Sequence, residues 1–226
     1  LENGMHIPPT LMTEAVLLIA SGVAVLALLA AAATARWRAL ADDPTRLHLV
    51  AGGALACLLL WLLNIHVANG VLLHFLGVTT LTLVVGWSFT LLGLGVALVP
   101  FTLLQQLPWE GLGLSFCLSV LLPATVTRAL LVLLYRPSLR HPFVYFLGAG
   151  FAGGGLVVLT LSLVVAFLFW LSGLDGYLDN MKEFWPLVFL LMFSEGFING
   201  MCVSAFAVFY PDWVKTFDDR FYLDNP

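Results

Sequence analysis

Histidine is the residue type in this sequence whose placement most clearly suggests chemistry. The chain of 226 residues has five histidines, and imidazole is the commonest protein ligand for transition-metal ions. His66 and His74 flank a short connection that contains Asn69-Gly70, a signal for a turn. On one continuous helix their spacing of eight residues would separate them by about 12 Å, too far to share an ion. A chain reversal would remove that obstacle, so the spacing permits a shared metal without requiring one.

The start of the chain offers a second set of nitrogen ligands, in the string Met5-His6-Ile7-Pro8-Pro9. If Met5 is the first residue, its free amine, the His6 amide nitrogen and the His6 imidazole form a compact chelate. A fourth imidazole nitrogen would complete a square-planar set, which favours Ni(II) or Cu(II) and admits Co(II) less strictly. We expect Met5 to be the true start, with Leu1–Gly4 added before it or read from a misjudged start. Residues 1–10 are then an extracytoplasmic metal-binding segment.

The composition determines what kind of molecule must position these ligands. Apolar residues make up 61% of the chain and charged residues 10%, with a mean hydropathy of +1.02. A soluble domain has about 45–50% apolar and about 25% charged residues, so a water-soluble globule is excluded. A formal net charge of −4 also gives no reason to expect a nucleic-acid partner. The sequence therefore predicts an integral membrane protein in contact with the lipid bilayer.

Seven apolar runs are long enough for transmembrane helices, which need about 20 residues each. They are too long and too apolar on all sides for barrel strands. We predict an all-α, polytopic fold, with one transmembrane domain over residues 1–226. The predicted helices cover 11–35, 47–65, 71–87, 88–106, 112–136, 142–172 and 185–210.

Basic and aromatic residues give this arrangement an orientation. Arginines and lysines gather between the first and second helices, between the fifth and sixth, and in the tail at 211–226, whereas Lys182 alone lies on the opposite side. The positive-inside rule therefore places the N-terminus outside and the tail in the cytoplasm. All seven tryptophans, Trp61 among them, fall at or near predicted helix ends, as expected for membrane interfaces. No cleavable signal peptide is evident, so we expect the first helix to be retained.

Two charged residues within the apolar runs need partners. An unpaired carboxylate near mid-membrane is costly, so we expect Glu195 to be protonated, hydrogen-bonded or paired. Arg128 is the basic candidate at depth, although it lies about 9 Å further toward the cytoplasm. Asn199 follows Glu195 by one helical turn. A structural pair or a helix contact with Asn199, and a role in contacting a partner subunit or in transport, both remain open for Glu195.

Several motifs spread over nearly the whole chain point to one family. They are Met5-His6-Ile7, the stretch from Asn64 to His74-Phe75-Leu76-Gly77, Leu104-Gln105-Gln106-Leu107 leading to Gly111-Leu112, and Glu195-Gly196-Phe197-Ile198-Asn199-Gly200 with the later Tyr210-Pro211-Asp212. These motifs resemble those of the CbiM/NikM-type metal-capture subunit of cobalt and nickel importers of the energy-coupling-factor class. The last block is the most specific, and the sequence resembles a divergent branch of that family.

The resemblance implies a function and a ligand set. It implies a metal bound through the Met5 amine, the His6 amide and ring, and His74, and we keep His66 as a further candidate. It implies capture of nickel or cobalt outside and passage inward as the substrate-specific subunit. The implied partners are a coupling transmembrane subunit, cytoplasmic ATPases and, as an option, a small accessory membrane subunit. The implied location is the plasma (inner) membrane of a prokaryote.

Other functions stay open as alternatives. The sequence has no GxxxxGK[ST] phosphate loop, so we expect no enzyme here and ATP hydrolysis only in partners. An intramembrane hydrolase using the histidines and Glu195 is disfavoured, because neither HExxH nor GxSxG appears. A gradient-driven carrier for another solute and a non-transporting membrane scaffold remain. Copper or zinc also remains possible as the ion, since almost any site of four nitrogens prefers copper.

Overall fold

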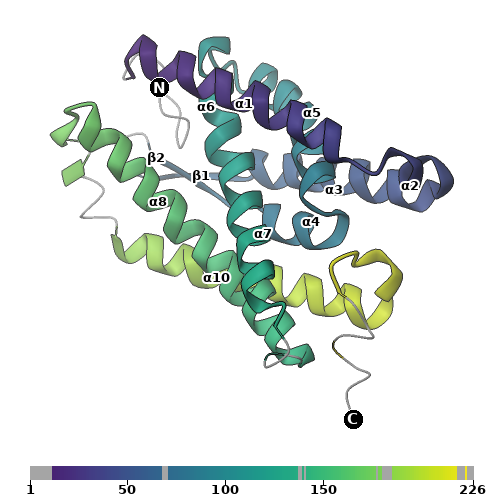
Figure 1. Cartoon of the computed structure of the whole chain (residues 1–226). Coiled ribbons are helices and arrows are strands. Elements are labelled where there is room, and N and C mark those ends of the chain that lie inside the picture. Colours follow the sequence, from purple (N-terminus) through teal and green to yellow (C-terminus); the bar gives the residue numbers. More distant parts are fainter. Residues whose placement is uncertain are drawn as a thin grey trace.

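The computed structural model describes residues 12–67, 71–136, 139, 141–176, 178–179, 185–217 and 222. Helices dominate this part of the chain (Figure 1). The first half contains α1 (Glu14–Thr34), α2 (Trp37–Asp42), α3 (Pro44–Leu62), the strands β1 (Asn64–Val67) and β2 (Val71–His74), α4 (Val78–Val85) and α5 (Trp87–Leu104). The second half contains the short 3-10 helix Trp109–Gly111, α6 (Leu112–Phe116), a π-helix (Cys117–Leu121), α7 (Leu122–Leu134), a longer π-helix (Val144–Ala152), α8 (Gly153–Leu171), α10 (Trp185–Phe209) and the 3-10 turn Pro211–Trp213.

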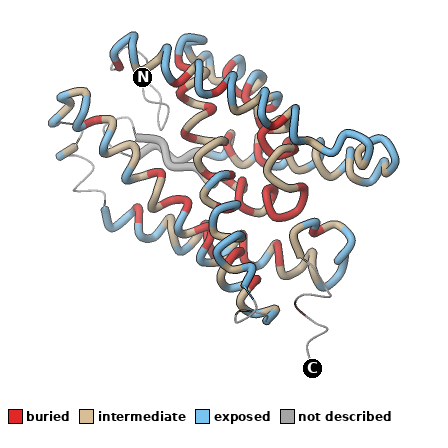
Figure 2. The backbone as a smooth tube through the Cα atoms, viewed as in Figure 1, coloured by how far each residue is buried: buried red, intermediate tan, exposed pale blue. Residues whose placement is uncertain are grey.

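Six helical segments in the described residues are long and apolar enough to cross a membrane. They are Glu14–Thr34, Pro44–Leu62, Trp87–Leu104, Trp109–Leu134, Val144–Leu171 and Trp185–Phe209. Their outer faces carry large apolar side chains, such as Leu18 and Phe189, each 72% exposed. Figure 2 shows the buried residues gathered where the helices face one another. The prediction of an all-α, polytopic membrane protein is confirmed.

The third predicted helix, at 71–87, is wrong as a continuous helix. The segment begins as β2 and becomes helical only in α4, whose eight residues span about 12 Å, less than half of a bilayer core of about 30 Å. Gly77 (φ 65°) and Gly86 (φ 87°) bound α4 in conformations that favour glycine, so the helix stops at both ends. Hydropathy counts apolar residues and is insensitive to such breaks.

The hairpin and α4 nevertheless return the chain from one end of the bundle to the other. Thr34 Oγ1 lies 2.9 Å from Ser88 Oγ, which joins the end of α1 to the start of α5. The Lys215 amide donates to the Val84 carbonyl at 3.0 Å, so the segment after α10 meets the end of α4 at the same level. Arg46, near the start of α3, lines a small cavity with Val84 and Lys215. The third passage is therefore a hairpin followed by a half-length helix.

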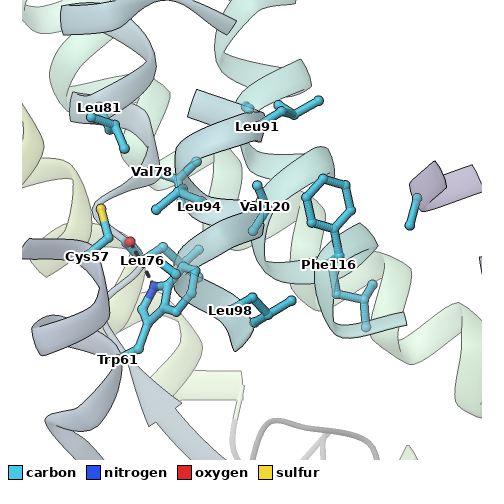
Figure 3. Close-up of a cluster of buried hydrophobic side chains, with 14 of the residues drawn as sticks. Cys57, Trp61, Leu76, Val78, Leu81, Leu91, Leu94, Leu98, Phe116 and Val120 are labelled. Atoms are coloured by element: carbon cyan, nitrogen blue, oxygen red, sulfur yellow. Dashed lines mark hydrogen bonds between the residues drawn. The ribbon is translucent and has the colours of Figure 1, made fainter. Parts of the chain in front are cut away.

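The core that supports this passage lies between α3, α4, α5 and the α6–α7 segment. Figure 3 shows Leu94 and Leu98 of α5 beside Val120 and Trp61. Trp61 is 1% exposed and packs edge-on against Phe101, with ring centroids 5.7 Å apart. Trp61 lies at the end of α3, as predicted, but its indole is a core group with an internal hydrogen-bond partner and does not face lipid.

Candidate metal centre

The hairpin brings two of the predicted ligand positions onto one face. The strands are antiparallel, and the register pairs Asn64 with His74 and His66 with Leu72. Paired residues, and residues two apart on one strand, share a face of the ladder, so positions 66 and 74 lie on the same face. Diagonal neighbours in such a ladder are about 7–8 Å apart, compared with about 12 Å on a helix. The chain reversal that the sequence only permitted is present.

The other two predicted ligands, Met5 and His6, lie outside the described residues. Within the described part of the chain, no group of three or more His, Cys, Asp or Glu side chains is arranged to hold a metal ion. The described residues therefore supply the framework of contacts that positions the hairpin.

The backbone just beyond His74 is fixed by the carboxylate of Glu195. The Leu76 amide donates to Glu195 Oε2 at 3.0 Å, and the Gly77 amide donates to Oε1 at 2.9 Å. Glu195 comes from α10 and is 1% exposed. An amide left without an acceptor at such depth would be costly. Glu195 thus holds the peptide two and three residues after the predicted metal ligand.

The same peptide is held from the opposite side by α3. The Trp61 indole Nε1 donates to the Leu76 carbonyl at 3.1 Å, a bond drawn in Figure 3. The peptide that joins Leu76 to Gly77 therefore has its carbonyl bound by α3 and its N–H bound by α10. These two bonds fix the orientation of this peptide plane just beyond β2.

Asn199 extends the attachment into the first turn of α4. Its Oδ1 accepts from Thr80 N at 2.8 Å and from Thr80 Oγ1 at 2.6 Å, and its Nδ2 donates to Glu195 Oε1 at 2.9 Å. The first amides of a helix have no partner within the helix, and Gly77 has no side chain to cap them. Glu195 and Asn199, one turn apart on α10, together perform this capping.

Arg128 does not take part in this arrangement. Its guanidinium lies 5.2 Å from the centroid of the Trp87 ring, at the other end of α4. Glu195 is hydrogen-bonded to Asn199 and to backbone amides, one of the alternatives that the sequence left open. Peptide N–H groups and Asn199 therefore bind the carboxylate in place of Arg128, and the contact with Asn199 is among the predicted alternatives.

Sequence reasoning missed two residues of this framework. Trp61 was interpreted as an interfacial residue, and Thr80 was not considered. A signal was available for the location, because Gly77 closes the His74-to-Gly77 motif and the spacing of Glu195 and Asn199 puts both on one helix face. Nothing in the sequence indicated that this face meets the backbone after β2.

Comparison with known families gives one match. A family model described as the cobalt uptake substrate-specific transmembrane region, CbiM, matches residues 6–213. The matched range includes the hairpin, α4 and the capping pair on α10. No curated protein and no solved structure matches the chain.

Proposed function

The chain belongs to the CbiM family of cobalt uptake substrate-specific transmembrane proteins, and from this premise we propose how it handles its ion. It is a multi-pass protein of the prokaryotic plasma membrane and a substrate-specific component of cobalt uptake. In our proposal it captures a divalent ion, cobalt or nickel, on the extracytoplasmic side. It then passes the ion inward as a subunit of an importer of the energy-coupling-factor class.

The proposed ligands are the Met5 amine, the His6 amide and imidazole, and the imidazole of His74. His66 shares a face of the hairpin ladder with His74, and we assign it as an additional ligand or as a support for the residues that bind the ion. One observation carries this assignment: Glu195 accepts hydrogen bonds from the amides of Leu76 and Gly77, two and three residues after His74. A ligand whose backbone is fixed on two sides loses less conformational entropy when it binds an ion.

Energy and release are assigned to partners. The chain is proposed to be no enzyme, with ATP hydrolysis in cytoplasmic ATPases and mechanical coupling through a second transmembrane subunit. The attachment of α4 at both ends supports a route for such coupling, since α10 caps its start and the segment after α10 binds its last carbonyls. A partner that moves the end of α10 would move the hairpin with it.

The test uses protein that begins at an authentic Met5 and isothermal titration with Co(II) and Ni(II). We expect stoichiometric binding, lost in His6→Ala and in His74→Ala. His48→Ala is the matched control, because His48 is an exposed histidine near the opposite end of α3. A second control extends the protein by Leu1–Gly4, which blocks the Met5 amine and should weaken binding.

Two results would overturn the proposal. Stoichiometric binding that survives the combined His6→Ala and His74→Ala substitutions would show that the ligands are elsewhere. Uptake of the ion by cells that lack any ATPase partner would identify a gradient-driven carrier instead.

A further inference from the structure

A polar cavity of about 410 Å³ lies at the end of α4 that is remote from the hairpin. The end of α1, the break between α4 and α5, the middle of α7 and the segment after α10 form its walls. Three of its lining residues are cationic, Arg36, Arg128 and Lys215, and none of the lining residues is acidic. The hydroxyl-bearing residues that also line it are Thr34, Thr82, Ser88 and Thr216.

The three cations have no carboxylate partner among the described residues. The ion pair found among the described residues joins Arg46 and Asp43 instead, with 3.4 Å between Nε and Oδ2. Burial lowers the pKa of Lys215, and the charges of Arg46 and Arg36 lower it further. Arg36, Arg128 and Lys215 are exposed where they line the cavity. Like charges held close together repel one another, so a bound anion would relieve this repulsion.

Aromatic rings and a helix start orient these groups. Arg128 lies over Trp87, and the Lys215 Nζ lies 5.6 Å from the centroid of the Phe89 ring. Cations over ring faces are held in place by the ring quadrupole. The rings belong to the first turn of α5, a helix of 18 residues whose positive dipole end lies at the same wall. Cationic side chains and helix amides together match a phosphate group.

The position in the membrane favours a lipid as the source of that phosphate. The cavity lies at the helix ends where basic residues gather, which is the side predicted to face the cytoplasm. Anionic phospholipids attract lysine and arginine at this surface. Val85, Leu131 and Trp87 add apolar wall, and Val132 of α7 is 68% exposed, so acyl chains can lie beside the cavity. We propose that this cavity binds the phosphate of an anionic phospholipid through Arg36, Arg128 and Lys215.

The test uses the full chain, purified and stripped of lipid, and counts bound lipid by native mass spectrometry. Short-chain phosphatidylglycerol should bind with clear preference over phosphatidylcholine. Arg128→Gln combined with Lys215→Gln should weaken phosphatidylglycerol binding by about tenfold for each cation removed. The matched control, Arg38→Gln with Arg136→Gln, removes the same charge from exposed positions that do not line the cavity. It should leave the preference intact.

A charge-conserving pair, Arg128→Lys with Lys215→Arg, guards against misfolding of the neutral variant and should still prefer phosphatidylglycerol. Equal affinity for both lipids, or equal loss in the test and control variants, would overturn the proposal. Inorganic phosphate that binds as tightly as the lipid would show a site for a soluble anion.

Asp218 and Asp219 follow Lys215 in the sequence. Lipid binding that appears only in Asp218→Asn with Asp219→Asn would mean that the chain neutralises its own cations, and the proposal would be wrong. Metal titration is independent of all these readouts.

Discussion

Replacing Glu195 by alanine should release the backbone that follows β2. Glu195 accepts hydrogen bonds from Leu76 N, Gly77 N and Asn199 Nδ2. Alanine leaves the two backbone amides buried without an acceptor, at a cost of about 1–3 kcal/mol each. The docked form of the hairpin base is then destabilised by about 2–6 kcal/mol. Glu195→Gln keeps one acceptor oxygen and should have a smaller effect.

This cost sets a ceiling on the loss of metal affinity. A change of about 2–6 kcal/mol shifts the ratio of docked to undocked hairpin by about 30-fold to about 10⁴-fold. If only the docked form binds the ion, the apparent dissociation constant rises in inverse proportion to the docked fraction. The loss of metal affinity equals the full shift in the docking equilibrium when the hairpin of the unchanged protein is only marginally docked. It is smaller when the docked form is strongly favoured to begin with.

Two measurements on protein that begins at Met5 separate the steps of this argument. Hydrogen–deuterium exchange at Leu76 and Gly77 reports docking, and Co(II) titration reports affinity. Ser194→Ala is the matched control, because the Ser194 hydroxyl bonds the Leu190 carbonyl of its own helix at 3.0 Å and should affect neither readout. Unchanged exchange in Glu195→Ala would refute the anchoring role. Faster exchange with unchanged cobalt affinity would refute the hairpin as the platform for the ion.

Three further substitutions test the framework at other points. Gly77→Ala places a side chain at φ 65° and within 3.3 Å of Cys57 Sγ. The backbone strain alone should lower the free energy of unfolding by about 1–2 kcal/mol. Thermal unfolding should detect this loss, and cobalt titration should show weaker binding. Trp61→Phe removes the donor to Leu76 and should lower the free energy of unfolding by about 0.5–1.5 kcal/mol. The control Trp37→Phe should have a smaller effect, because the hydrogen bond from the Trp37 indole to the Ala32 carbonyl is exposed. Lys215→Gln should raise the melting temperature at neutral pH in lipid-free detergent, unlike Arg38→Gln. The pKa of Lys215 is lowered in the folded protein, so the charged form of its side chain opposes folding. The gain in melting temperature should therefore vanish as pH rises above the ordinary lysine pKa, where the side chain is neutral in the folded and the unfolded state.

The membrane helices could be predicted from the sequence because a single physical requirement governs them. Each apolar run of about 20 residues must form a helix to satisfy its backbone in lipid, and the described residues contain six such helices. The third run failed because the same requirement can be met by protein contacts. Asn69-Gly70 is a turn signal in the sequence between the two strands, and Gly77 and Gly86 bound the short helix, but an averaged hydropathy profile hides such local signals.

The partners of the candidate site were harder to predict than its members. Glu195 and Asn199 stood out as polar residues in an apolar run, and their spacing placed them on one face of α10. Sequence reasoning then looked for an opposite charge and considered Arg128. Besides Asn199, the actual partners of Glu195 are peptide N–H groups, which nearly every residue carries, so no residue type marks them. The burial of Trp61 was not predicted for a related reason, since the acceptor of its indole N–H is a backbone carbonyl.

The break in the third passage explains why these contacts exist at all. A continuous helix over 71–87 would use its inner amides and carbonyls within itself and offer none to its neighbours. The interruption frees the amides of Leu76, Gly77 and Thr80 for α10. It also frees the carbonyls of Leu83 and Val84, which accept from the amides of Thr216 and Lys215. Both ends of α4 are therefore bound by one stretch of chain, α10 and the segment after it. A displacement of that stretch must shift the hairpin that carries His66 and His74, or break these bonds.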